Sequence, residues 1–113
     1  MGRGQAQAAA EDVSGVRLIV REAAQEDIRE AVEWYDRQSP GLGAEFVRCL
    51  DACLSLISRH PEMFPEMHRQ ARMALMRRFP YLVIYRPTTE FISVIAVMHG
   101  SRHPRRWKRR TEP

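Results

Sequence analysis

Apolar residues recur along the chain with two different periods, and the change of period predicts its helices and strands. Apolar and charged residues alternate from Val16 to Glu22, which is typical of a strand with one buried face. From Gln25 to Gln38 and again from Gly43 to Arg59, apolar residues recur every three or four positions, which predicts two amphipathic helices. Because only a short break around Ser39-Pro40-Gly41 separates them, we expect an antiparallel helical hairpin.

The second half of the chain predicts three consecutive strands. They run from Arg72 to Arg78, from Tyr81 to Arg86 and from Phe91 to His99, and turn residues separate them. The last strand is almost continuously apolar, so we expect it to be central in the sheet. The stretch from Pro61 to His68 is predicted to be a loop. This order predicts an α+β fold: a strand, two helices and a three-strand antiparallel meander, with the helical hairpin packed on one sheet face.

The chain of 113 residues is long enough for one domain. Residues 1–15 show no amphipathic period and are predicted to be a mobile N-terminal extension. Residues 16–104 are predicted to be the folded domain, and residues 105–113 a basic C-terminal tail that adds little to stability. No apolar stretch is long enough to cross a bilayer, and no signal-peptide pattern is present. We therefore expect a cytoplasmic protein with no membrane partner.

Charge is distributed unevenly along the chain. Residues 1–50 have a net charge of −3 and residues 51–113 have a net charge of +7. The excess is concentrated between Arg102 and Arg110, which favours an acidic partner such as nucleic acid, the ribosome or an acidic protein. In the same segment Trp107 stands among cations, a pattern that suits stacking on a base or contact with an acidic protein. Alternatively, Trp107 folds back onto the domain.

The sequence offers little for metal or cofactor chemistry. The four histidines have no zinc-ligand spacing, and no glycine-rich phosphate loop occurs, so we expect neither a metal nor a cofactor. Cys49 and Cys53 lie four positions apart in the second predicted helix, a spacing at which a disulfide would need distorted geometry. We expect both to be buried, inert thiols.

Residues near the last predicted strand have the side chains that metal-independent RNA cleavage needs. This reaction requires a base for the 2′-hydroxyl, cations for the phosphate and an acid for the leaving oxygen. His99 ends the last strand and Arg102 follows it, Tyr85 lies on the strand before it and Arg78 ends the first meander strand. The simpler interpretation is that His99 ends the strand and the arginines are solvated.

Trp34 and Tyr35 are neighbours on the first predicted helix, about 100° apart, so both cannot face the centre of one buried stripe. One of them is expected to be partly exposed, as residues at partner surfaces often are. The alternative is that Trp34 covers the edge of the core.

A series of short motifs makes the chain resemble the RelE/ParE superfamily of toxins from bacterial type II toxin–antitoxin systems. The resemblance covers roughly residues 17–108 and depends on the order of the motifs over the whole domain. The motifs are Ala24…Asp27-Ile28…Glu30-Ala31…Trp34-Tyr35, Pro40-Gly41-Leu42-Gly43…Phe46, Ile57…His60-Pro61…Phe64-Pro65, Arg78-Phe79-Pro80-Tyr81…Tyr85, and Val94-Ile95-Ala96-Val97-Met98-His99…Arg102…Pro104…Trp107. The Trp-Tyr helix, the Pro-Gly-Leu-Gly turn and the Phe-Pro-Tyr turn are more similar to the ParE side.

The resemblance implies a growth-arresting toxin that forms a hetero-oligomer with a cognate antitoxin and reaches operator DNA only through it. The ParE side implies DNA gyrase as the target, without enzymatic activity. The RelE side implies a ribosome-dependent mRNA endonuclease, and a third alternative is a non-toxic corepressor that only binds its antitoxin. The residues implied are Trp34, Tyr35, Phe46 and Leu50 for antitoxin binding, Arg102, Arg105, Arg106, Trp107 and Lys108 for target binding, and Arg78, Tyr85, His99 and Arg102 if RNA is cut.

Overall fold

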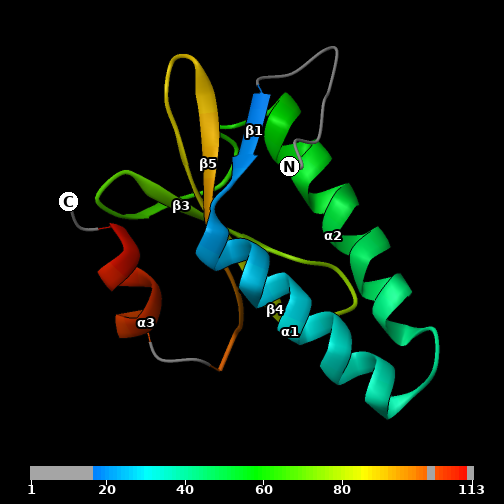
Figure 1. Ribbon diagram of the computed structural model, residues 1–113. Helices are drawn as coiled ribbons and strands as arrows, with labels where there is room; N and C mark the ends of the chain where they lie inside the picture. Colours follow the sequence, from blue (N-terminus) through cyan, green and yellow to red (C-terminus); the bar gives the residue numbers. More distant parts are fainter. Residues whose placement is uncertain (1–16, 102–103, 112–113) are drawn as a thin grey trace.

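The computed structural model describes residues 17–101 and 104–111 of the chain (Figure 1). The predicted N-terminal extension, residues 1–15, lies outside the described residues, as do Arg102 and His103. The elements, in chain order, are β1 (Arg17–Val20), α1 (Glu22–Gln38), α2 (Leu42–Arg59), β2 (Glu66–His68), β3 (Ala71–Leu75), β4 (Tyr81–Pro87), β5 (Phe91–His99), α3 (Pro104–Lys108) and the 3₁₀ turn η1 (Arg109–Thr111).

The strands form one five-stranded sheet in the order β1-β5-β4-β3-β2. β1 pairs with β5 in parallel, with Leu18 opposite Ile92, and every other pairing is antiparallel. The hairpin of α1 and α2 covers one face of this sheet, and α3 lies on the other side of β5 (Figure 1). The predicted α+β class and the packing of the hairpin on one sheet face are confirmed, and β5 lies between two strands as its apolar sequence indicated.

The helical hairpin is closed by a tight turn between α1 and α2. Gly41 has a φ of 90°, a left-handed conformation that glycine adopts without strain. The Gly43 amide donates a hydrogen bond to Asp36 Oδ1 at 2.8 Å, which satisfies one of the open N–H groups at the start of α2. A Cβ atom on Gly43 would lie 2.8 Å from the Val32 carbonyl oxygen. The absence of a side chain at Gly43 thus lets the two helices lie closer together than a larger residue would permit.

Two elements differ from the expectation. The first is β2, within a stretch predicted to be a loop, which makes the meander four strands long. Its three residues are exposed or half-buried, so they show no alternation that would reveal a strand. β2 returns into β3 through Arg69 and Gln70, whose φ values of 49° and 67° form a left-handed turn without the glycine that normally marks one.

The second difference is α3, which lies in the segment predicted to be a basic tail that adds little to stability. Residues 104–108 are helical, and Trp107 is buried with 4% of its surface exposed. The Trp107 side chain packs on the second sheet face with Ile84, Ile95 and Met98. The expectation of a tail is therefore wrong for residues 105–111, and the alternative that Trp107 folds back onto the domain is confirmed. The sequence showed no helical period because Trp107 is the single buried side chain among residues 104–110.

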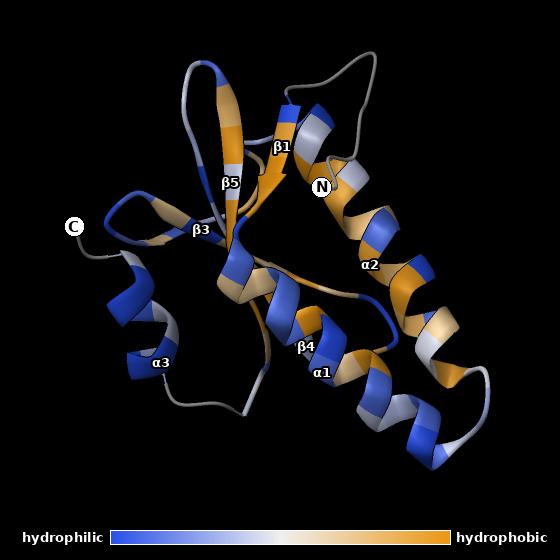
Figure 2. Cartoon of the chain, viewed as in Figure 1, coloured by the Kyte–Doolittle hydropathy of each residue, from blue (hydrophilic) through white to orange (hydrophobic). Residues whose placement is uncertain are grey.

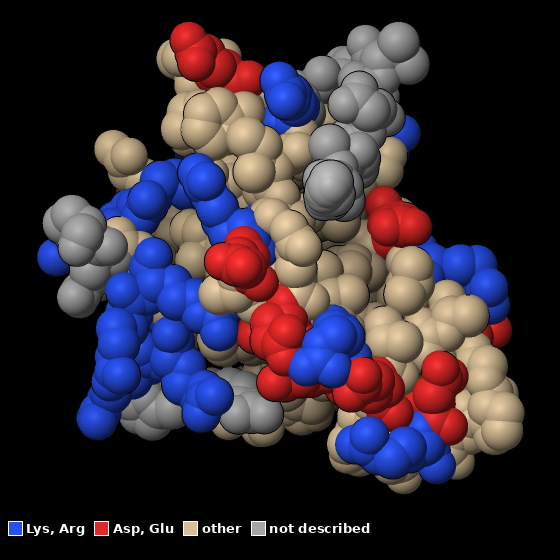
Figure 3. Space-filling model, viewed as in Figure 1, with Lys and Arg blue, Asp and Glu red and all other residues tan. Residues whose placement is uncertain are grey.

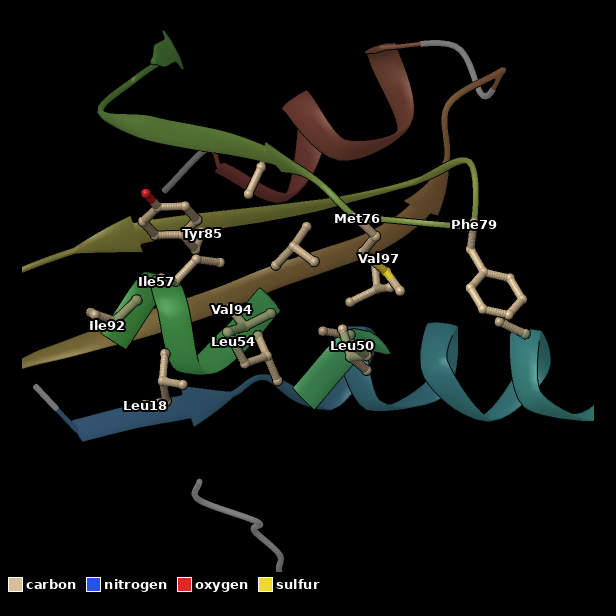
Figure 4. Close-up of a cluster of buried hydrophobic side chains, with 14 of the residues drawn as sticks. Leu18, Leu50, Leu54, Ile57, Met76, Phe79, Tyr85, Ile92, Val94 and Val97 are labelled. Carbon is tan, nitrogen blue, oxygen red and sulfur yellow. The ribbon is translucent and has the colours of Figure 1, made fainter. Parts of the chain in front are cut away.

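The main core lies between the helical hairpin and the sheet. Leu50, Leu54 and Ile57 of α2 meet Val94 and other strand residues in an apolar cluster (Figure 4). Most residues of α1 and α3 are hydrophilic, whereas those of β5 are largely hydrophobic (Figure 2). This distribution follows the amphipathic period of the sequence, with polar residues left on the outer side of each helix.

Candidate functional site: the cleft between α1, β5 and α3

The site is built where β1 stops and β5 continues. β1 ends at Val20, opposite Val94, and the amide of the next residue, Arg21, donates to the Val94 carbonyl at 3.0 Å. Beyond this point, residues 95–99 of β5 have no strand beside them on the β1 side within the described part of the chain. A register shift against β4 occurs here, because Tyr85 pairs with Val94 but Ile84 pairs with Ala96.

Two side chains take the place of the missing strand. The Val97 amide donates to Asp27 Oδ2 at 3.0 Å, and the Ile95 carbonyl accepts from Arg110 Nη1 at 3.1 Å. Asp27 and Arg110 also bind each other, with N–O distances of 2.7 and 3.1 Å. Two of the backbone groups that a neighbouring strand would have used on β5 are therefore occupied by one ion pair that joins α1 to η1.

Between α1 and α3, the end of the β5 edge forms the floor of a cleft of about 520 Å³. We call it the α1–α3 cleft. Its α1 wall carries acidic and aromatic residues, its floor is formed by the ends of β4 and β5, and its α3 wall carries Arg106. The lining residues are Asp27, Glu30, Ala31, Glu33, Trp34, Tyr35 and Arg37 from α1, Tyr81, Val97, Met98, His99 and Ser101 from the sheet and the following turn, and Arg106.

The two walls of the cleft have opposite net charge, because three acidic side chains outnumber Arg37 on the α1 wall and Arg106 lies on the α3 wall. Asp and Glu side chains form a band along α1, next to Lys and Arg gathered over α3 (Figure 3). Glu33 is already paired with Arg29 at 2.7 Å on the outer surface of α1. Glu30 and Arg106 are both exposed, on opposite walls. A ligand in the cleft therefore meets negative potential on one side and positive potential on the other.

The aromatic end of the cleft begins at Trp34, which remains 49% exposed. Its ring lies edge-on to Tyr35, with 5.0 Å between the centroids. Tyr35 in turn packs against Phe46 and Phe79 of the core, and burial raises the pKa of its phenol. Trp34 is thus an exposed ring on a rigid base, which lowers the entropy cost of binding through it.

His99 lies on the floor of the cleft beside Tyr81, with 5.4 Å between the ring centroids. Its Nδ1 atom accepts the Ser101 amide at 3.1 Å and lies 2.8 Å from the Ser101 hydroxyl. These bonds fix the imidazole at the end of β5. The simpler interpretation of the sequence, that His99 ends the strand, describes this geometry.

Of the four residues expected to bind an antitoxin, the cleft contains two. Trp34 and Tyr35 line it, whereas Phe46 and Leu50 are 0% and 3% exposed in the core between hairpin and sheet. The assignment of Phe46 and Leu50 to an antitoxin surface is therefore wrong, because their positions on the apolar stripe of α2 face inward. An apolar stripe alone cannot distinguish the core from an interface.

The residues considered for RNA cleavage are not brought together. Tyr85 is 0% exposed and its hydroxyl donates to the Pro61 carbonyl at 2.8 Å, so the phenol points into the hairpin face. Arg78 pairs with Glu45 of α2 at 3.0 Å. His99 pairs with Tyr81, four residues from Tyr85 along β4, a separation of roughly 13 Å. The fourth residue, Arg102, lies outside the described residues.

The residues of α3 that were expected to bind a target differ in their exposure. Arg105, Arg106 and Lys108 are exposed, whereas Trp107 is buried against the sheet and cannot stack on a ligand. Trp107 is thus corrected from a contact residue to an anchor. Arg102 lies outside the described residues.

Sequence reasoning did not identify the Asp27–Arg110 ion pair. In the sequence, Asp27 stands out only as part of the motif Ala24…Asp27-Ile28, and Arg110 only as one cation among several. Their partnership spans 83 positions, so no local signal could have revealed it.

Other side-chain chemistry in the described part of the chain is sparse. Residues 17–101 and 104–111 contain no group of three His, Cys, Asp or Glu side chains that could hold a metal ion. Cys49 and Cys53 are free and half-buried rather than fully buried, and burial raises the pKa of Cys53 to about 11, so this thiol stays protonated at neutral pH. None of the described helices is long and apolar enough to span a membrane.

Comparison with known proteins identifies the family of the domain and agrees with its fold. Residues 18–104 match the family model for the ParE toxin of the type II toxin–antitoxin system parDE. Toxin ParE2 from two strains of Mycobacterium tuberculosis is 32% identical over 89 residues, which covers 78% of this chain and 85% of the relative. The fold is shared with the structure titled chromosomal ParDE TA system from P. aeruginosa, at a TM-score of 0.66 and 14% identity, covering 73% of this chain and 92% of that one. The chain therefore belongs to the ParE toxin family of type II toxin–antitoxin systems.

Proposed function

We propose that the chain arrests growth by inhibiting DNA gyrase and that a cognate antitoxin neutralises it by occupying the α1–α3 cleft. Family membership makes the chain a ParE-type toxin with an antitoxin partner, and its resemblance to the ParE side implies gyrase as the target. One observation carries the proposal: charged and aromatic side chains gather at an open cleft, while the residues considered for RNA cleavage lie apart.

The cleft suits a protein ligand better than a small molecule. It is open, its walls carry opposite charges, and a large aromatic ring stands half exposed at one end. Tryptophan is frequent among the few residues that dominate binding energy at protein interfaces. Glu30 and Arg106 on opposite walls would fix the direction of a bound segment, because reversing it would place like charges together.

Inhibition by binding requires less of the chain than RNA cleavage does. A cleaving site needs a base, an acid and phosphate-binding cations within hydrogen-bond reach of one scissile group. Among the described candidates, Tyr85 is buried on the hairpin face and Arg78 is paired with Glu45, which leaves His99 alone in the cleft. Binding to gyrase requires a complementary surface, and the exposed cations of α3 provide long-range attraction to an acidic one.

The target is tested in two parallel assays with the purified chain. Supercoiling by purified gyrase should decrease as the chain is added and recover when the antitoxin is added. Ribosome-bound mRNA should remain intact in the presence of the chain. Cleavage at defined codons that is lost in His99→Ala, with gyrase unaffected, would favour the endonuclease instead. Antitoxin binding without either effect would favour the corepressor.

The antitoxin surface is tested by calorimetry with one variant and a matched control. Trp34→Ala should weaken antitoxin binding by about 2 kcal/mol or more, because it removes a half-exposed aromatic from the cleft. Leu75→Ala is the control, since Leu75 is 65% exposed on β3 and does not line the cleft. Unchanged affinity for Trp34→Ala, or an equal loss in both variants, would exclude the cleft as the antitoxin site. Operator DNA should be bound only in the presence of the antitoxin under the salt conditions of the cell.

A further inference from the structure

Beside the α1–α3 cleft, the outer side of α3 and η1 forms a second hollow of about 560 Å³, and its lining consists of Arg105, Arg106, Arg109 and Arg110. Five of the eight residues from 104 to 111 are cationic and none is acidic. Figure 3 shows Lys and Arg concentrated in this part of the surface. Like charges gathered around one hollow create a positive potential, which attracts a ligand of negative charge.

The hollow has a fixed scaffold. Trp107 anchors α3 to the sheet, and its ring lies 6.1 Å from that of His68. The Thr111 hydroxyl donates to the Lys108 carbonyl at 2.7 Å, and Arg86 of β4 donates to the Thr111 carbonyl at 3.0 Å. Arg110 is held by Asp27. The backbone that carries the arginines is therefore ordered before any ligand arrives, which lowers the entropy cost of binding.

The lining identifies the chemical class of the ligand. Arginine presents a planar fork of donors that binds phosphate oxygens in pairs. Several such forks around one hollow match a ligand that carries several phosphates close together, and nucleic acid carries a negative charge at every nucleotide. The hollow has no apolar lining residue that would bind the side chain of an acidic peptide.

The burial of Trp107 distinguishes double-stranded from single-stranded nucleic acid. Proteins that hold single strands place aromatic rings against the unpaired bases. Here the one aromatic residue of the segment faces the sheet and is 4% exposed. The surface thus offers cations and no stacking ring, which suits contact with the phosphate backbone of a duplex, where the bases are already stacked.

We propose that the arginine-lined hollow of α3 and η1 is a binding site for the phosphate backbone of duplex DNA. It contacts DNA without reading its sequence and does so weakly, so that binding is strong only at low salt or when another protein holds the DNA close. The inference goes beyond inhibition of gyrase and does not require it. If the toxin does act on gyrase, this site places it against the DNA that the enzyme carries.

The test measures fluorescence anisotropy of a labelled 20-base-pair duplex of random sequence, with the full chain and no gyrase present, over a series of salt concentrations. The logarithm of the binding constant should fall linearly with the logarithm of the salt concentration. The double variant R106Q/R109Q should bind at least about tenfold more weakly at low salt and should reduce the salt slope by about 1.8, since each phosphate contact contributes about 0.9.

The matched control is R48Q/R59Q, which removes the same charge from exposed positions of α2. It should change affinity less than twofold, and circular dichroism should show both variants folded. Equal losses in the two variants would mean that net charge alone attracts DNA and would overturn the site. The absence of saturable binding at low salt, or tighter binding to a single strand of equal length, would overturn it as well. Each of these results leaves gyrase inhibition to be judged by its own assay.

Discussion

The two faces of the sheet are covered in different ways. On one face, α1 and α2 bury a continuous apolar cluster that includes Leu50, Leu54 and Ile57 (Figure 4). On the other face, α3 and η1 contribute one buried aromatic, Trp107, together with the ion pair of Arg110 and Asp27. The hairpin is held by buried apolar area, whereas α3 is held by a single ring and a few polar contacts.

This difference implies that the two coverings unfold separately. Apolar burial contributes to stability in proportion to area, so losing the hairpin means losing the domain. A segment with few buried apolar contacts opens locally at a lower free energy than global unfolding. We therefore expect α3 to be the separable part of the described domain, and the following predictions test this expectation from the largest effect to the smallest.

Phe46→Ala should produce the largest loss. The side chain is 0% exposed and packs against Tyr35, Phe79 and Tyr81. Truncating a buried aromatic typically costs 3–5 kcal/mol, so we expect about 4 kcal/mol in the free energy of unfolding. Urea denaturation followed by circular dichroism measures it. Leu75→Ala, at an exposed position, should stay within about 0.5 kcal/mol.

Trp107→Ala should cost less, about 2–3 kcal/mol, because α3 can undock before the hairpin unfolds. Hydrogen exchange locates the effect: amides of α3 and η1 should exchange faster, whereas those of α2 should change much less. Loss of protection spread evenly over both faces would show that α3 and the helical hairpin unfold as one cooperative unit, which would contradict their separate unfolding.

The Asp27–Arg110 pair should show a coupling of about 1–2 kcal/mol in a double-mutant cycle with Asp27→Asn and Arg110→Gln. The side chains are 14% and 26% exposed, so water screens them only in part. Arg29–Glu33 is the reference pair, with side chains 54% and 53% exposed, and should couple by about 0.3–0.5 kcal/mol. Equal coupling in both cycles would show that the pair is no stronger than a surface contact.

Tyr85→Phe should have the smallest effect at neutral pH, about 1 kcal/mol from the lost hydrogen bond to Pro61. Burial raises the pKa of Tyr85 to about 12, above the value near 10 of an exposed phenol. The folded state therefore holds the phenol proton more tightly than the unfolded state. Its contribution is complete below pH 10 and is lost as pH rises toward 12.

Denaturation at pH 8, 10 and 11 measures this dependence in the native chain and in Tyr85→Phe. The native chain should lose stability more steeply over this interval. Because Tyr85 is on the hairpin face, the loss should appear in α2 as well as in the sheet. Parallel curves for the two proteins would assign the alkaline loss to other groups.

The sequence predicted the hairpin face well because its signals are local. The apolar period along α1 and α2 and the continuous apolar run of β5 each lie within a window of a few turns. β2 was not predicted because it is too short to show a period, and α3 was not predicted because it depends on contacts distant in the chain. β2 is three residues long, and α3 is held by Trp107, whose neighbours in the cluster come from β3, β4 and β5.

The candidate site was predicted less well than the fold. The expectation that one of Trp34 and Tyr35 is partly exposed is confirmed by Trp34, and it followed because two adjacent aromatics on a helix cannot both face the core. Phe46 and Leu50 were misassigned because an apolar stripe is the same pattern whether a sheet or a partner covers it. The parallel pairing of β1 with only part of β5, which creates the cleft, depends on where β1 stops in space.

The ion pair on the exposed part of β5 also has a consequence for self-association. An open strand edge is a template on which a second copy of the same chain can add a strand, and proteins commonly block such edges with charged side chains. Asp27 and Arg110 occupy the Ile95 carbonyl and the Val97 amide, the groups on which that pairing would begin. The two side chains that stabilise one molecule at this edge thereby also oppose the pairing of the edge with a second copy.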